Sequence, residues 1–160
     1  MKRLISLLIL FSLLLAGCGE KLKEPVTFYY VRAGYESDMT SIIDSELRES
    51  SGHRGDLSYL LALYFMGPAD EELLSPLPEG TSIVSVSRSG ASITLHLSDT
   101  SDSMTDNQFT LACSCLTLTC LELTDAESVT IISGHRSVTM NADTMLLQDL
   151  TTANYTEESK

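Results

Sequence analysis

Apolar side chains recur with a helical period near the middle of the chain. They stand at positions i, i+3, i+4 and i+7, which lie on one face of a helix: Leu57, Leu60, Leu61 and Tyr64. Asp56 stands where an N-cap belongs, since its carboxylate can accept hydrogen bonds from the free N–H groups of the first turn. Gly67 and Pro68 favour an end to the helix, because glycine adopts the left-handed C-cap conformation and proline cannot continue the hydrogen-bond ladder.

A proline-rich connector and a β-hairpin follow. The connector is Ser75-Pro76-Leu77-Pro78-Glu79-Gly80, and its prolines favour a stiff, extended chain. A strand over Thr81–Ser87, a turn at Ser89-Gly90 and a return strand through Ile93, Leu95 and Leu97 are predicted next. We expect the connector to fix the passage from helix to sheet, because proline sets φ and Gly80 permits a sharp turn. The alternative is that exposed helix faces and the sheet edge form a docking surface.

The flanking segments add further strands and a second helix. Val26–Arg32 is rich in aromatic and β-branched residues and is predicted to be a strand with Val26, Phe28 and Tyr30 on one face. Residues 33–55 are polar and are expected to be a loop, with at most a short edge strand or turn around Ile42, Ile43 and Leu47.

A second helix is expected after Asp106, its predicted cap. Its apolar residues cover much of its circumference, which indicates burial against the sheet: Phe109, Leu111, Ala112, Cys113, Cys115, Leu116, Leu118 and Leu123. A strand at 128–132, a turn at Ser133-Gly134 and an edge strand at 136–140 follow. The predicted class is α/β (α+β), a single domain of order β-α-β-β-α-β-β with one mixed sheet and both helices on one face.

The N-terminus has the features of a lipoprotein signal peptide over residues 1–17. Lys2 and Arg3 precede a leucine-rich run, and Leu15-Ala16-Gly17-Cys18 fits a lipobox, so Cys18 is the predicted lipidation site. A lipid carrying acyl chains such as palmitate would then hold the protein at the outer face of the cytoplasmic membrane. We expect residues 18–25 to be a tether, 26–140 the domain, and 141–160 a partly disordered tail.

The central motif resembles the GerMN domain of spore-formation and germination lipoproteins. The residues that carry the resemblance are Gly67, Pro68, Ser75, Pro76, Pro78, Gly80 and Thr81. It implies a helix ending in Gly-Pro, a hairpin, a second helix and a final strand, covering roughly residues 26 to 140. It also implies a link to sporulation or germination.

The charge balance argues against nucleic acid as a partner. The chain carries 22 acidic and 10 basic residues. Loss of Lys2 and Arg3 with the signal leaves 22 against 8, a net charge of −14. A surface this acidic is repelled by phosphate backbones.

No catalytic constellation is visible in the sequence. The three histidines, His53, His96 and His135, have no ligand spacing, and there is no G-x-S-x-G or S-x-x-K motif and no glycine-rich phosphate cradle. Cys113, Cys115 and Cys120 cannot pair within an intact helix, since Cys113 and Cys120 are about 10.5 Å apart along its axis. We read them as small core residues. No cofactor and no metal are predicted.

Two hypotheses for function follow. The first is a non-catalytic, lipid-anchored interaction or scaffold protein of the cell envelope, with an envelope protein as partner and sporulation or germination as its setting by resemblance. The second is a lipoprotein that binds a small ligand or the cell wall, although one layer of sheet and helices offers no second lobe to close on a solute. A hydrolase is disfavoured by the missing constellation.

Overall fold

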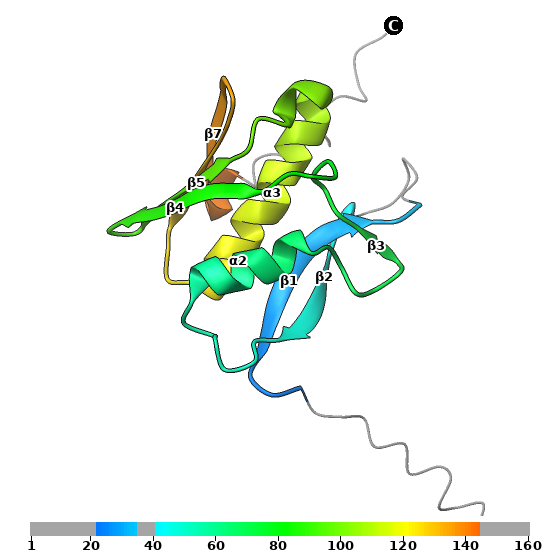
Figure 1. The fold of residues 1–160 in the computed structure, drawn as a ribbon, viewed down its shortest axis with the longest axis vertical. Coiled ribbons are helices and arrows are strands. Elements are labelled where there is room, and N and C mark those ends of the chain that lie inside the picture. The colour runs from blue at the N-terminus through cyan, green and yellow to red at the C-terminus, as the bar shows by residue number, and fades with distance from the viewer. Residues whose placement is uncertain (1–21, 35–40, 145–160) are drawn as a thin grey trace, which may run out of the picture.

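The computed structural model describes residues 22–34 and 41–144 of the chain (Figure 1). The predictions for the signal peptide, Cys18 and the tail after Thr144 lie outside these residues. Within the two described ranges, no helix is long and apolar enough to cross a membrane.

The first sheet contains three strands in the order β2-β1-β3, all antiparallel. They are β1 (Pro25–Arg32), β2 (Ile43–Glu49) and the short β3 (Leu73–Leu74). The predicted inner face of β1 is confirmed, because Val26, Phe28 and Tyr30 are all buried.

The segment expected to be mainly a loop contains the seven-residue strand β2 at the sheet edge, so the loop expectation was wrong there, and the edge strand considered around Ile43 and Leu47 is present and longer than expected. β2 pairs with β1 from Pro25↔Glu49 to Val31↔Ile43. Its side chains on the inner face are charged, so the strand lacks the alternation that marks a half-buried strand. These residues stand opposite Tyr30, Phe28 and Val26 of β1: Asp44, Glu46 and Arg48.

The helix α2 (Leu57–Phe65) forms as the apolar period predicts. The Asp56 carboxylate accepts the Tyr59 N–H at 3.1 Å, and Gly67 follows the helix with φ +87°. Leu60, Leu61 and Tyr64 are buried. The Tyr64 ring stacks on Tyr30 at 4.6 Å between ring centroids, and this contact packs the helix against β1.

The second sheet has four strands in the order β4-β5-β6-β7. They are β4 (Ile83–Ser89), β5 (Ser92–Leu97), β6 (Ser128–Ser133) and β7 (Arg136–Met140). Both predicted hairpins are confirmed, since β4 with β5 and β6 with β7 are antiparallel. β5 and β6 run parallel, and the short 3₁₀ helix η1 (Ser101–Ser103) and the helix α3 (Asp106–Leu123) make the crossover between them.

The helix α3 lies between the two sheets and packs against β1, β6 and β7 (Figure 1). Its apolar residues are therefore buried around most of the helix. Its cap is Thr105, not the predicted Asp106: Thr105 and Gln108 form a capping box, in which each side chain bonds to the other residue's backbone N–H. Asp106 is the first helical residue.

The predicted α/β class is confirmed, but the strands form two sheets where one mixed sheet was expected. The reason lies at the edge of β1, which β3 covers only at Val31 and Arg32. Further along this edge, the Tyr29 N–H donates to the Thr119 hydroxyl of α3 at 3.0 Å. The Tyr29 carbonyl accepts from the Tyr64 hydroxyl of α2 at 3.1 Å. Side chains of two helices thus satisfy the backbone groups that a further strand would otherwise bond.

Substitutions of two threonines of α3, Thr119 and Thr117, should therefore change the free energy of unfolding differently. Thr119→Val should lower the free energy of unfolding by about 1–3 kcal/mol, because it leaves the Tyr29 N–H without its acceptor. Thr117→Val is the matched control, since the buried Thr117 hydroxyl has no hydrogen-bond partner among the described residues and the change should be neutral or stabilising. Urea denaturation of both variants measures the difference, and equal effects would contradict this role for Thr119.

Candidate functional site

The Gly67-Pro68 segment is held by a charged pair from β2. The Glu46 carboxylate accepts the backbone N–H groups of Ala69 and Asp70, each at 3.0 Å. Arg48 donates to Glu46 at 2.9 Å and to the Gly67 carbonyl at 3.1 Å. Only 8% of the Glu46 side chain is exposed, so the pair is largely shielded from water. The helix end and β2 are therefore locked together by charge-assisted hydrogen bonds.

The connector is a chain of short local turns. The Ser75 hydroxyl bonds to the Leu77 backbone, and Leu77 packs against the core. The Thr81 N–H donates to the Pro78 carbonyl at 3.1 Å and closes a β-turn in which Gly80 has φ +82°. The Thr81 hydroxyl then bonds to Pro78 and to Thr100, which ties the connector to the segment before α3.

Gly80 should be sensitive to substitution for conformational reasons alone. A side chain here would meet no atom within 4 Å, but its φ of +82° disfavours a β-branched residue. Gly80→Val is expected to lower the free energy of unfolding by about 1–3 kcal/mol. Gly55→Val is the control, because Gly55 is also open to solvent and lacks a positive φ. Thermal unfolding of the pair tests this, and equal stability of the two variants would count against it.

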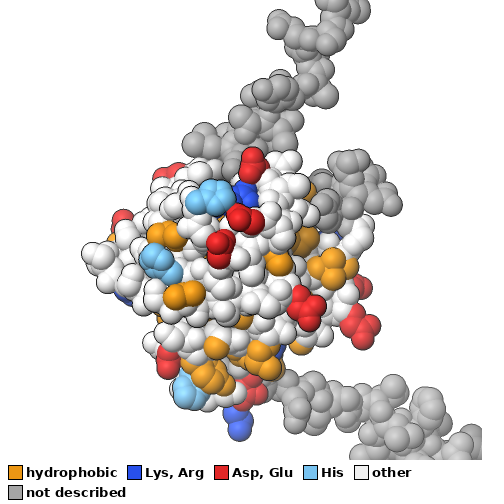
Figure 2. All heavy atoms as spheres, turned by 45° about the horizontal axis from the view of Figure 1, so that its top comes forward, with side chains coloured by type: hydrophobic (Ala, Val, Ile, Leu, Met, Phe, Trp, Pro, Cys, Tyr) orange, Lys and Arg blue, Asp and Glu red, His pale blue; other side chains and the backbone are white. Residues whose placement is uncertain are grey.

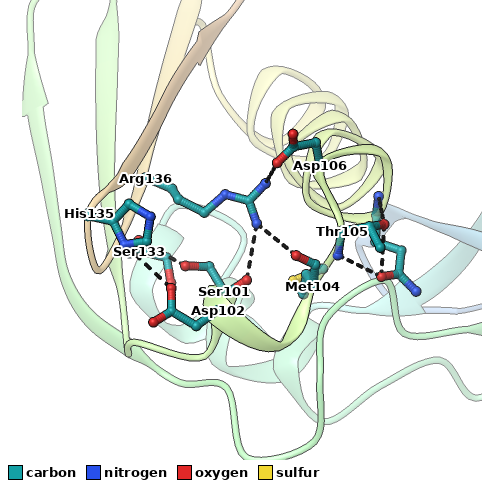
Figure 3. A network of polar contacts seen from close by, with 9 residues as sticks. Ser101, Asp102, Met104, Thr105, Asp106, Ser133, His135 and Arg136 are labelled. Carbon is teal, nitrogen blue, oxygen red and sulfur yellow. Dashed lines mark hydrogen bonds and ion pairs between the residues drawn. The ribbon is translucent and has the colours of Figure 1, made fainter.

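A second polar network joins the loop before α3 to the hairpin of β6 and β7 (Figure 3). The Arg136 guanidinium donates to the carbonyls of Ser101 and Met104, both at 3.1 Å, and to the Asp106 carboxylate at 2.7 Å. It lies over the Phe109 ring, 4.1 Å from the centroid, in a cation–π contact. These three hydrogen bonds of the guanidinium go to two carbonyls and one carboxylate of the same chain, so they tie the β6–β7 hairpin to the loop before α3.

The histidines lie apart from one another. His135 faces Asp102, with Nδ1 and Oδ1 3.4 Å apart on an exposed surface (Figure 3). His53 stacks on Tyr59 at 4.1 Å between ring centroids. His96 is half-buried on β5, between the buried Leu95 and Leu97, and points away from the core. The described part of the chain contains no group of three residues placed to hold a metal ion.

The three cysteines of α3 are buried and unpaired, so the prediction that they are core residues is confirmed. Burial raises the pKa of the Cys113, Cys115 and Cys120 thiols to about 12. Thiols held in the neutral form are poor nucleophiles and poor metal ligands. The cysteines therefore contribute packing rather than chemistry.

The hydrogen bonds of Glu46, Arg48 and Arg136 could not be predicted from the sequence. Glu46, Arg48 and Arg136 carry no local motif, because their partners are backbone atoms far away in the sequence. A recess of about 150 Å³ lies near the start of β1 and is lined in part by Val26, Arg54 and Glu122. It is small beside the usual range of roughly 300–1,000 Å³ for small-molecule pockets.

The chain was compared with known protein families and with proteins of curated function. The profile of the Germane family, described as "Sporulation and spore germination", matches residues 27–137. Among proteins of curated function, no sequence matches the chain.

Two solved structures are similar. The tandem GerMN domains of the sporulation protein GerM from Bacillus subtilis match with a TM-score of 0.52 and 19% identity, over 70% of this chain and 39% of GerM. A protein from Clostridium perfringens, described provisionally as a lipoprotein, matches with a TM-score of 0.45 and 14% identity, over 74% of this chain and 89% of that one. The GerMN resemblance of the sequence is thus confirmed by profile and fold, and the chain belongs to the Germane family.

Proposed function

We propose that this chain is a lipid-anchored, non-catalytic interaction protein of the cell envelope that acts in spore formation or germination. The observation that carries the proposal is the family match over residues 27–137, whose description names both processes. The chain spans 39% of the GerM structure, so the partners of that longer protein are not transferred to this one.

The anchor is supported by the sequence before the domain. Lys2, Arg3, the leucine-rich run and the lipobox ending at Cys18 together fit a lipoprotein signal. Export and lipidation would place the domain on the outer face of the cytoplasmic membrane. Two acyl chains hold such a protein firmly, since each buried methylene contributes about 0.8 kcal/mol.

The interaction role is supported by how the conspicuous polar residues are used. Glu46, Arg48 and Arg136 are engaged with backbone groups. The exposed surface is acidic and includes Glu71 and Glu72 in the loop before β3. A partner with a basic or polar surface would complement this charge, and its association should weaken as salt rises.

The test is capture of the partner from intact cells of a spore-forming bacterium that expresses the full chain. Chemical cross-linking, affinity purification and mass spectrometry should recover one envelope protein, and Glu71→Lys with Glu72→Lys should reduce its yield without unfolding the domain. Glu127→Lys, also exposed, is the charge-reversal control. Native mass spectrometry that instead finds a bound small molecule, with no protein partner, would favour a ligand-binding lipoprotein.

A further inference from the structure

The helix α2 is apolar on its solvent side as well as on its buried side. Residues 57–66 contain no charged side chain. Opposite the buried residues, the exposed positions i, i+3 and i+7 form what we call the outer face of α2: Tyr59, Ala62 and Met66, with Ser58 exposed beside them and Leu63 half-buried against the core. Met66 is 79% exposed and Tyr59 is 36% exposed. An exposed apolar stripe on so acidic a protein is a candidate contact surface.

The helix α2 starts at the end of the domain where the described chain begins, close to the start of β1. The Ser50 N–H donates to the Glu24 carbonyl at 3.4 Å, so the loop before α2 is tied to the segment before β1. Arg54 of that loop lines the recess together with Pro25 and Val26. Tyr59 stacks on His53 of the same loop. Figure 1 shows this loop at the lower end of the domain, where the described chain begins, and α2 above it towards the middle of the molecule.

The length of the tether sets how far this end can lie from a membrane. Leu22, the first described residue, is the fourth after Cys18 and is 42% exposed. Four extended residues span at most about 14 Å. A lipid on Cys18 therefore keeps the loop before α2 and the start of that helix close to the bilayer surface. In Figure 2, hydrophobic side chains gather beside one histidine and one basic residue at this lower end.

We infer that the outer face of α2 rests on the lipid bilayer, as a second contact beside the lipid anchor. The inference rests on the anchor in the proposed function. The contact is apolar rather than electrostatic, because Lys23 and Arg54 at this end are balanced by Glu24 and Asp56. Tyrosine and aliphatic side chains on a helix that lies in the plane of the membrane suit the boundary between headgroups and acyl chains.

The absence of tryptophan from the sequence allows a clean test. Three single-tryptophan variants of the full, lipidated chain are compared: Met66→Trp, Tyr59→Trp and, as control, Val84→Trp. Val84 is 69% exposed on the edge strand β4, in the other sheet. Each variant is reconstituted into phosphatidylcholine vesicles whose acyl chains carry bromine, which quenches nearby tryptophan. Flotation on a density gradient reports the anchor independently.

The expected result is flotation of all three variants, with a shift to shorter wavelength and loss of emission for the tryptophans at 59 and 66 only. Flotation with equal emission from all three would overturn the membrane contact and leave the anchor intact. A shift at residue 66 that depends on protein concentration and occurs without vesicles would show that a second copy covers this face, which also overturns it. Protein that does not float with the vesicles has no membrane anchor, and this result would contradict both the proposed anchor and the membrane contact of α2.

Discussion

Tyr64→Ala should lower the free energy of unfolding by about 3–5 kcal/mol. The Tyr64 side chain is 1% exposed, stacks on Tyr30 and meets Phe28 edge-on at 5.8 Å between ring centroids. The Tyr64 hydroxyl donates to the Tyr29 carbonyl at 3.1 Å, and the Tyr64 backbone carbonyl accepts from the Tyr30 hydroxyl at 3.0 Å. The substitution therefore removes packing and leaves a carbonyl on the open edge of β1 unsatisfied.

The matched control for this change lies on the same helix. Tyr59→Ala removes a partly exposed ring that stacks on His53, so it should lower the free energy of unfolding by about 1 kcal/mol or less. Urea denaturation at neutral pH measures both variants. A Tyr64→Ala protein as stable as the Tyr59→Ala protein would contradict the packing of α2 against β1.

Alkaline pH should destabilise the domain through the three buried thiols. Their pKa in the folded protein is about 12, against an ordinary value of 9.0. Above pH 9 the unfolded chain loses these protons and the folded chain keeps them. The stabilisation is therefore complete below about pH 9 and is lost as pH rises towards 12. Ionisation of each thiol in the unfolded chain lowers the free energy of unfolding by about 1.4 kcal/mol per pH unit in this window. The three thiols together therefore lower it by about 4 kcal/mol by pH 10.

The pH dependence can be measured by urea denaturation between about pH 8 and pH 10. Burial also raises the pKa of Tyr30 and Tyr64, so these residues add to the loss only at higher pH, above their ordinary value of 10.0. The variant with Cys113, Cys115 and Cys120 all changed to Ala is the control, and its stability should depend far less on pH below about 10. A native protein whose stability is flat over this range would show that the thiols ionise freely in the folded state.

The elements that could be predicted from the sequence are those specified by local signals. The apolar period and the Asp56 cap define α2, and a glycine in each tight turn defines the two hairpins. The α/β class follows from these elements, and the GerMN resemblance follows from the motif between Gly67 and Thr81 that joins them. Local signals were sufficient because each of these structures forms between residues near in sequence.

The strand β2 could not be predicted, because its stabilising contacts are distant in sequence. Its inner face carries Asp44, Glu46 and Arg48 where a half-buried strand has apolar residues. Asp44 pairs with Arg32, and this hydrogen bond lowers the pKa of the Asp44 carboxyl. Glu46 and Arg48 bond to the Gly67–Asp70 segment. Charged residues that have partners in the fold are indistinguishable in the sequence from residues of a solvated loop.

The split into two sheets was missed for a related reason. At the edge of β1 the Thr119 hydroxyl accepts the Tyr29 N–H, and this contact joins residues 90 positions apart that no local pattern connects. The Asp106 cap was wrong by one residue, because Thr105 and Gln108 together form a capping box that Asp106 cannot form. In both cases a hydroxyl side chain makes the decisive hydrogen bond.

In the proposed function, Cys18 anchors this Germane domain to the membrane. The most direct test of this anchor is the mass and membrane association of the native chain and of Cys18→Ala, both expressed in a bacterium with lipoprotein processing. The native chain should be recovered from the membrane fraction as a mature, lipid-modified protein that begins at Cys18. The variant should be found released from the membrane or as the unprocessed precursor. Mature Cys18→Ala protein that stays bound to the membrane would contradict the claim.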